Sequence, residues 1–210
     1  MLIKANGRIV FAGDSITDDG RKRPIGEGLW GGQGNGFVRM VDTFLAVDYP
    51  DMNIRCTNMG ESGNTSTELL ARWECDVNDL NPDLVVLCIG VNDVWRQFDC
   101  PACPDYAVTP EDYEDNLNKA ADMTKAKMLW LTPYYLETNL ADPMRKRMDE
   151  YGAAMKKVAA ERGITCVDLQ YEFDGYLKHR HPSYITWDRV HPGWIGSLII
   201  ARAVLKALME

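Results

Sequence analysis

The alternation of short apolar runs with longer amphipathic segments constrains the fold of this chain more than any other feature. Continuous apolar runs of strand length are typical of parallel strands that are covered on both faces of a sheet. Several of these runs end in Gly or Pro, which commonly terminate strands. The predicted strands are 8–13, 54–60, 84–90, 127–133 and 164–169.

Helical periodicity appears in segments that follow or separate these runs. Thr109 is a candidate N-cap, and Pro110 suits the first position of a helix. No linker, low-complexity tract or internal repeat interrupts the alternation. We therefore predict an α/β sandwich around a parallel sheet, with residues 1–210 forming a single domain. The predicted helices are 36–49, 65–73, 109–126, 143–162 and 192–208.

Composition restricts the class of partner. The chain has 210 residues, of which 46% are hydrophobic, so it is long enough to bury a sizeable core. Its formal net charge of −8 disfavours binding to nucleic acid or to an anionic membrane surface, and a neutral partner fits better. The start of the sequence does not resemble a secretory signal, and no apolar run is long enough for a membrane helix. We expect a cytoplasmic protein.

One candidate catalytic residue follows each of the first three predicted strands. In parallel sheets, ligands bind beyond the carboxyl ends of strands, at the point where the strand order reverses. Ser15, Gly60 and Asn92 stand just past these ends, so we expect them to meet at one edge of the sheet. A serine hydroxyl is a poor nucleophile unless a base accepts its proton.

The most suitable base is His191, because it lies three residues after Asp188 and just before the last predicted helix. An Asp at this spacing can accept a hydrogen bond from Nδ1–H and leave Nε2 free to take the serine proton. The other two histidines, His179 and His181, lie in a charged segment. The alternative is that Asp188 only caps the last helix and that His191 is an ordinary surface residue.

An acyl-transfer site also needs donors for the oxyanion of the tetrahedral intermediate, each worth about 10²- to 10³-fold in rate. The backbone amides of Ser15 and Gly60 and the side-chain amide of Asn92 are the candidates. The alternatives are that Gly60 only permits a tight turn and that Asn92 only forms one. We further expect Asp14 to organise the turn around Ser15, and Asp93 to cap the segment after the third strand.

Four sequence blocks resemble one known family. "GDSIT", "NMGESGNT", "GVND" and "DRVH" occur in the order and at the approximate separations of the SGNH (GDSL) hydrolases, and they span 13–191. The resemblance implies a flavodoxin-like three-layer α/β/α fold with a sheet of about five strands. It also implies Ser15 as nucleophile, His191 as base with Asp188 behind it, and oxyanion donors at Ser15, Gly60 and Asn92.

Longer segments, such as "GVNDVWRQFD" and "WDRVHP", resemble the carbohydrate-esterase branch of the family, in particular intracellular acetyl-xylooligosaccharide esterases. That likeness implies removal of acetyl groups from an acetylated oligosaccharide or another small acyl ester. The reaction is a two-step acyl transfer that requires no organic cofactor and no metal. A homo-oligomer is expected, since such small intracellular enzymes commonly assemble.

The tryptophans near these sequence blocks favour a sugar ester as the substrate, because an aromatic face with a polar edge suits a sugar ring. Trp30, Trp95 and Trp187 each adjoin one of the chemical blocks, and we predict that two of the three line the cleft. Ordinary packing is the alternative for each of them. Trp130 and Trp194 are assigned to the core.

Other interpretations remain open. The same scaffold could serve a thioesterase or a lysophospholipase, and a non-catalytic carbohydrate-binding module would need the tryptophans but no relay. A carboxylate pair of Asp14 and Asp188, as in a glycosidase, would leave Ser15 without a role. Cys100 and Cys103 fit free thiols best, with a reversible disulfide or half of a zinc site as alternatives.

Overall fold

The computed structural model describes residues 1–99 and 107–210, and its centre is a parallel sheet of five strands. The strands lie in the order β2-β1-β3-β4-β5, and every neighbouring pair runs parallel. All five predicted strands are confirmed. The last is shorter than predicted, because Asp168 already caps the following helix. The bounds are β1 Arg8–Gly13, β2 Arg55–Gly60, β3 Leu84–Cys88, β4 Lys127–Leu131 and β5 Thr165–Val167.

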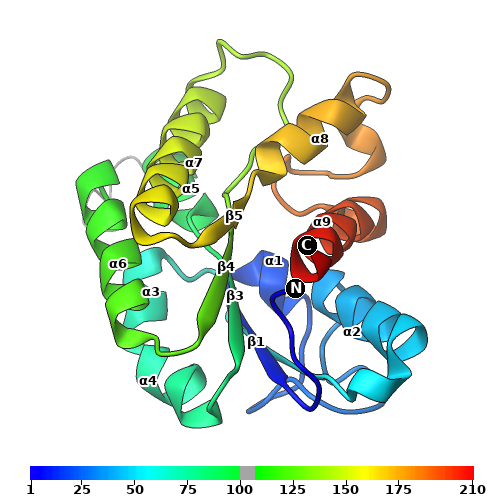
Figure 1. The fold of residues 1–210 in the computed structure, drawn as a ribbon. Coiled ribbons are helices and arrows are strands. Elements are labelled where there is room, and N and C mark those ends of the chain that lie inside the picture. The colour runs from blue at the N-terminus through cyan, green and yellow to red at the C-terminus, as the bar shows by residue number, and fades with distance from the viewer. Residues whose placement is uncertain (100–106) are drawn as a thin grey trace.

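Helices cover both faces of this sheet, as Figure 1 shows. Helices α3 to α7 lie on one face, and α2, α8 and α9 lie on the other. The three-layer α/β/α arrangement is therefore confirmed. The helices are α1 Ser15–Asp18, α2 Phe37–Asp48, α3 Ser66–Ala71, α4 Trp73–Asp76, α5 Val91–Asp99, α6 Pro110–Met123, α7 Pro143–Arg162, α8 Leu169–Leu177 and α9 Gly193–Met209. Short 3₁₀ turns form at Pro50–Met52, Asn78–Leu80 and Pro182–Tyr184.

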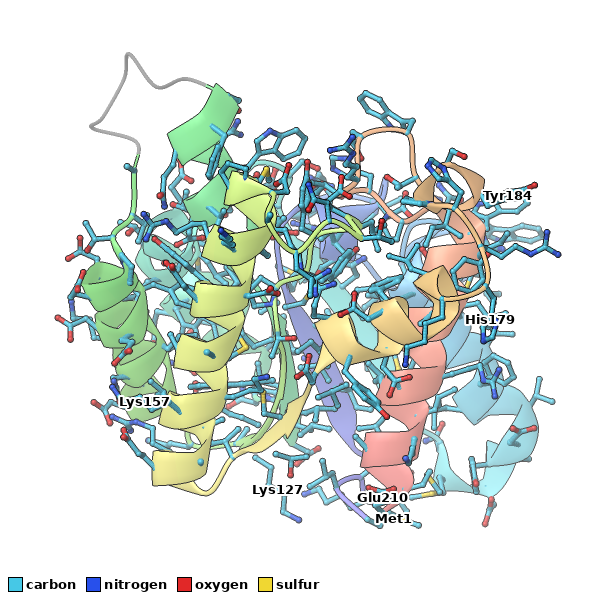
Figure 2. All side chains as sticks on the ribbon, turned by 90° about the horizontal axis from the view of Figure 1, so that it is seen from above. Met1, Lys127, Lys157, His179, Tyr184 and Glu210 are labelled. Carbon is cyan, nitrogen blue, oxygen red and sulfur yellow. The ribbon has the colours of Figure 1, made fainter. Side chains whose placement is uncertain are left out.

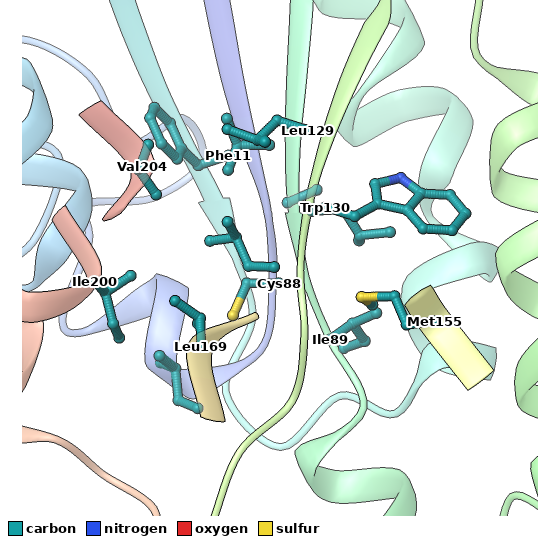
Figure 3. Packing of buried hydrophobic residues seen from close by; sticks show 14 of the residues in the cluster. Phe11, Cys88, Ile89, Leu129, Trp130, Met155, Leu169, Ile200 and Val204 are labelled. Carbon is teal, nitrogen blue, oxygen red and sulfur yellow. The ribbon is translucent and has the colours of Figure 1, made fainter. Parts of the chain in front are cut away.

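The core forms where the strands contact these two helical layers. In Figure 3, Phe11 projects from the sheet towards Val204 and Ile200 of α9, whereas Trp130 projects to the opposite side, towards Met155 of α7. All five side chains are completely buried. Because both faces are covered, β3 is apolar along its whole length and β1 and β4 are apolar after their first residues, whereas the edge strand β2 also carries buried polar side chains.

Local side chains set the helix ends. The Thr109 hydroxyl accepts a hydrogen bond from the Asp112 amide at 3.1 Å, and Pro110 occupies the first turn of α6, as predicted. Helix α7 begins at the N-cap Asp142 and ends at Gly163, which adopts the left-handed conformation at φ 66°. Four helices, α1, α4, α5 and α8, were not predicted; α1 and α4 have only four residues each, too few for sequence periodicity to reveal them.

The termini of the chain and the candidate catalytic residues lie at opposite ends of the strands. The order reverses between β1 and β3, so the residues that follow these two strands flank one crevice. At the other edge the Leu2 amide donates to the Leu208 carbonyl at 2.9 Å. Figure 2 shows Met1 and Glu210 side by side near Lys127, the first residue of β4. Within the described ranges, no helix is both long and apolar enough to cross a membrane.

Candidate active site

The turn after β1 presents Ser15 at the first position of α1. Asp14 is the N-cap, and its Oδ1 accepts a hydrogen bond from the Ile16 amide at 2.9 Å, which confirms its predicted role in the turn. Gly13 is required here, because a Cβ at this position would lie 2.3 Å from both Thr17 Oγ1 and the Cys88 carbonyl. The strand can therefore turn into the helix within one residue.

His191 contacts Ser15 across almost the whole length of the chain. Its Nε2 lies 2.8 Å from Ser15 Oγ, although 176 positions separate the two residues in sequence. Its Nδ1 lies 2.5 Å from Asp188 Oδ2. The structure thus brings the three residues together in the order alcohol, imidazole and carboxylate, which is the geometry of a serine-hydrolase relay.

The carboxylate of Asp188 is fixed by its own turn. Its Oδ1 accepts hydrogen bonds from the amides of Val190 and His191, at 2.9 and 2.8 Å, and from the Thr186 hydroxyl at 3.0 Å. Burial acts to raise the pKa of Asp188, but the hydrogen bonds from His191 and Val190 outweigh it and hold the pKa below its ordinary value. Asp188 does not cap the last helix, whose N-cap is Pro192.

Asn92 lies in the first turn of α5 and is 3% exposed. Its Nδ2 donates to the Asn64 carbonyl at 3.0 Å, and because a side-chain amide carries two hydrogens, the second remains for a ligand. The neighbouring Asp93 does not cap its own segment, contrary to expectation. Both of its oxygens accept from the Ser66 amide, at 3.1 and 3.0 Å, so it anchors α3 to α5. Burial raises the pKa of Asp93 to about 6.

Gly60 occupies a different environment from the one that the sequence predicts. It is the last residue of β2, and its amide donates to Asn58 Oδ1 at 2.9 Å. A Cβ on Gly60 would lie 2.2 Å from the Asp18 amide nitrogen, so the glycine allows β2 to approach the end of α1. The Gly60 amide is therefore already used by a protein acceptor, and the structure does not support it as an oxyanion donor.

Gly63, which the sequence analysis did not single out, is better placed. Within the described part of the chain its amide has no hydrogen-bond acceptor, and its φ of +86° favours glycine. It directly precedes Asn64, whose carbonyl Asn92 holds. The second glycine of "GESGN" is the available signal in the sequence, but the pattern does not show that the amide of the first glycine bonds to the Asn58 side chain.

Of the three tryptophans that were candidates to line the cleft, two flank His191. The ring centroid of Trp95 lies 5.9 Å from that of His191, and Trp187 stacks nearly parallel to the imidazole at 6.5 Å and 9°. Trp187 is 87% exposed, whereas Trp95 is partly buried against the core. Trp30 is exposed in the segment between α1 and α2, and no aromatic pair or hydrogen bond within the described residues joins it to His191 or Ser15. Its role in binding stays a prediction.

The core assignment is correct for Trp130 but wrong for Trp194. Trp194 is 77% exposed, because the second residue of α9 precedes the turns that pack on the sheet. Cys100 and Cys103 lie outside the described residues, so their pairing stays open. Among the residues that are described, no group of three His, Cys, Asp or Glu side chains could hold a metal ion.

Comparisons with known proteins agree with this geometry. Residues 11–197 match the GDSL-like lipase/acylhydrolase family. An acetylxylan esterase of Geobacillus stearothermophilus is 44% identical over 99% of this chain and 96% of its own length. Its crystal structure superposes with a TM-score of 0.97 over the same shares of the two chains. An alpha/beta hydrolase enzyme from the metagenome of Lake Arreo, Spain, is 45% identical with a TM-score of 0.95, covering 100% of this chain and 98% of that one. The chain therefore belongs to the GDSL-like lipase/acylhydrolase family.

Proposed function

We propose that the protein is a serine esterase that removes acetyl groups from carbohydrate esters, with acetylated xylooligosaccharides as the substrate class. The observation that carries the proposal is the hydrogen-bonded series Ser15, His191 and Asp188 at the carboxyl edge of the sheet. The substrate class is supported by the likeness to the Geobacillus acetylxylan esterase along nearly the whole chain.

The reaction proceeds in two acyl transfers. His191 Nε2 takes the hydroxyl proton as Ser15 Oγ attacks the acetyl carbonyl, and the π electrons of the carbonyl move to its oxygen. When the tetrahedral intermediate collapses, the bond to the sugar oxygen breaks and the imidazolium returns the proton to that oxygen. Water then repeats both steps on the acetyl-enzyme, which releases acetate and restores Ser15. The ionised Asp188 stabilises the imidazolium throughout.

Three donors are assigned to the oxyanion: the amides of Ser15 and Gly63 and the second Nδ2 hydrogen of Asn92. The assignment of Gly63 rests on its unused amide and on the hydrogen bond that joins Asn92 to the next residue. Ser15 contributes the first amide of α1, where the positive end of the helix favours a negative charge.

Acetate release from acetylated xylooligosaccharides, acetylated pectin fragments and acyl thioesters tests the substrate class. We expect the xylooligosaccharides to have the highest kcat/KM, and nitrophenyl acetate to react faster than nitrophenyl octanoate. In Ser15→Ala we expect kcat to fall by several orders of magnitude, on the order of 10⁶-fold if it resembles other serine hydrolases. Faster turnover of the octanoate or of the thioesters would instead support a lipase or a thioesterase on this scaffold.

We propose that a sugar ring stacks on Trp187 beside the catalytic residues, since this largely exposed indole ring lies next to His191. Stacking of this kind is worth roughly 0.5–1.5 kcal/mol beyond area burial. We therefore expect Trp187→Ala to raise KM for xylooligosaccharide esters about 3- to 10-fold while KM for nitrophenyl acetate changes little. Trp30→Ala, measured in parallel, tests the remaining tryptophan; an equal rise of KM for both substrates in Trp187→Ala would contradict sugar stacking.

A non-catalytic carbohydrate-binding module is the alternative from another class. It would need the aromatic side chains but not a serine within 2.8 Å of an oriented imidazole.

The proposal includes the cytoplasm as the compartment of the protein. It is supported by the free thiols of four cysteines, which are Cys56, Cys75, Cys88 and Cys166. It also includes self-association, since small enzymes of this kind commonly form homo-oligomers. Light scattering coupled to size exclusion measures the latter directly.

A further inference from the structure

The nucleophile and the Gly63 amide lie on segments that are remote in sequence, and one buried carboxylate connects these segments. Asp18 is the last residue of α1, one helical turn after Ser15, and is only 4% exposed. Buried carboxylates are rare unless donors surround them, because loss of hydration strongly disfavours the charge. The donors around Asp18 therefore indicate what its charge holds in place.

On one side, Asp18 holds the loop that carries Gly63. Its Oδ2 accepts hydrogen bonds from the Ser62 amide at 3.2 Å and from the Ser62 hydroxyl at 2.7 Å. Ser62 directly precedes Gly63, so these bonds fix the orientation of the chain one residue before the proposed donor. Two residues later, the Asn64 carbonyl is held by Asn92. The Gly63 amide thus lies between two fixed points.

On its other side, Asp18 binds Arg23. Together with Ser62 and Glu61, these two residues form one hydrogen-bonded cluster. The Arg23 guanidinium reaches both oxygens of Asp18, at 3.0 and 2.8 Å, and also donates to Glu61 Oε1 at 3.0 Å. Burial acts to raise the pKa of Asp18, but the hydrogen bonds from Arg23 and Ser62 outweigh it and hold the pKa below its usual range. Asp18 therefore remains ionised at neutral pH, and its charge is compensated within the cluster.

The peptide units next to this cluster have almost no freedom. Asn58 is completely buried, and its Nδ2 donates to the carbonyls of Thr17 and Asp18, at 2.6 and 3.2 Å. Its Oδ1 accepts from the Gly60 amide. The end of β2 and the end of α1 are thus joined independently of Asp18. Asp18 Oδ1 also accepts from the Arg21 amide at 3.2 Å, which orders the turn after α1, whereas Oδ2 holds Ser62, a residue after Gly60.

We propose that Asp18 is the positioning residue of the oxyanion hole, fixing the Gly63 amide relative to the α1 helix that carries Ser15. The inference rests on the proposed function, because it concerns the oxyanion that Ser15 generates. Donors act in the transition state only when they already point at the developing charge. A displacement of about 1 Å can cost on the order of 10²-fold in rate.

Asp18→Asn is the decisive variant. An amide keeps one acceptor oxygen, but its NH₂ group faces either Ser62 or Arg23, both of which are donors, so the loop must move. We expect kcat to fall about 10- to 100-fold with KM nearly unchanged. Methylboronic acid, whose boron bonds to Ser15 Oγ and places a hydroxyl where the oxyanion forms, provides the second readout. Its Ki should rise by the factor by which kcat/KM falls.

Two further variants separate positioning from stability. Ser62→Ala removes only the hydroxyl contact, and we expect a smaller loss, about 3- to 10-fold in kcat. Asp174→Asn breaks the 2.7 Å ion pair with Arg145 that joins α8 to α7, and should lower Tm without changing kcat. If Asp18→Asn does not fold, Ser62→Ala decides the question by its kcat and by its Ki for methylboronic acid.

Wild-type kcat and Ki in Asp18→Asn, or in Ser62→Ala if the first variant does not fold, would overturn the proposal. So would a loss of kcat with no matching rise in Ki, since a role confined to stability lowers the amount of active protein but not the affinity of what remains. Ser15→Ala, assayed alongside, identifies the other failure. If that variant still releases acetate, the proposed function is wrong whatever Asp18 does.

Discussion

At the scale of single residues, the carboxyl groups around the nucleophile have opposite pKa shifts. Asp14 is 1% exposed, and its Oδ2 has no hydrogen-bond partner within the described chain. Burial raises the pKa of Asp14 to about 7. Asp18 and Asp188 are held below their ordinary pKa by several donors each. Near neutral pH the site therefore contains two firmly ionised carboxylates beside one that is ready to take up a proton.

Asp14→Asn tests this difference through protein stability. The pKa of Asp14 is higher in the folded state, about 7, than its ordinary value of 3.8, so between these pH values the folded protein holds a proton that the unfolded chain has lost. The contribution of Asp14 to stability therefore declines as pH rises through this window. Asn caps a helix as well as Asp but carries no charge. We expect the free energy of unfolding of the variant, relative to wild type, to increase from pH 4 to pH 7 in urea titrations. A difference that does not depend on pH would contradict the assignment.

At the scale of elements, the sequence predicts the strands better than the loops between them. A strand buried on both faces leaves a continuous apolar run, such as Leu84–Cys88, and the flanking turn residues mark its ends. Gly60 and Gly63 show what such patterns cannot reveal. Gly60 ends β2 and Gly63 lies three residues later, and only the position of Asn58 Oδ1 decides which amide is already used. Similarly, Asp93 accepts a hydrogen bond from Ser66, the first residue of α3, a contact between remote segments that local spacing does not encode.

The N-terminus of α3 provides a prediction at this scale. The Glu68 amide donates to Thr65 Oγ1 at 3.4 Å, and the Glu68 carboxylate accepts from the Thr65 amide at 2.8 Å, which forms a capping box. We expect Thr65→Ala to lower the free energy of unfolding by about 1 kcal/mol. Because Thr65 directly follows Asn64, which Asn92 holds, kcat should also fall, by about 2- to 5-fold.

Thr109→Ala is the matched control, since Thr109 caps α6, a helix that carries none of the relay residues or proposed oxyanion donors. It should cost a similar amount of stability, about 1 kcal/mol, while kcat stays at the wild-type value. Chemical denaturation and initial rates on nitrophenyl acetate measure both quantities in the same preparations. Equal effects of the two variants on kcat would show that the α3 cap does not support the site.

At the scale of the whole molecule, the relay forms only when the two ends of the chain come together. Ser15 follows β1 at the start of the chain, whereas His191 precedes α9 at its end. Helices α2 and α9 pack side by side on one face of the sheet, and the Leu2 amide bonds to the Leu208 carbonyl at the far edge. The sequence could predict that Ser15 and Asn92 meet, because carboxyl ends of parallel strands share one edge, whereas it indicated His191 only through its spacing from Asp188. It could not predict the side-chain distances, which depend on the packing of α9.

Labelling with a fluorophosphonate, followed by peptide mass spectrometry, tests most directly whether His191 activates Ser15 in solution. The reagent transfers its phosphoryl group to an activated serine oxygen with loss of fluoride. We expect one label per chain, on Ser15, absent in Ser15→Ala and about 10⁴-fold slower in Asp188→Asn, which favours the wrong imidazole tautomer. Labelling of another residue, or an unchanged rate in Asp188→Asn, would contradict the activation of Ser15 by His191.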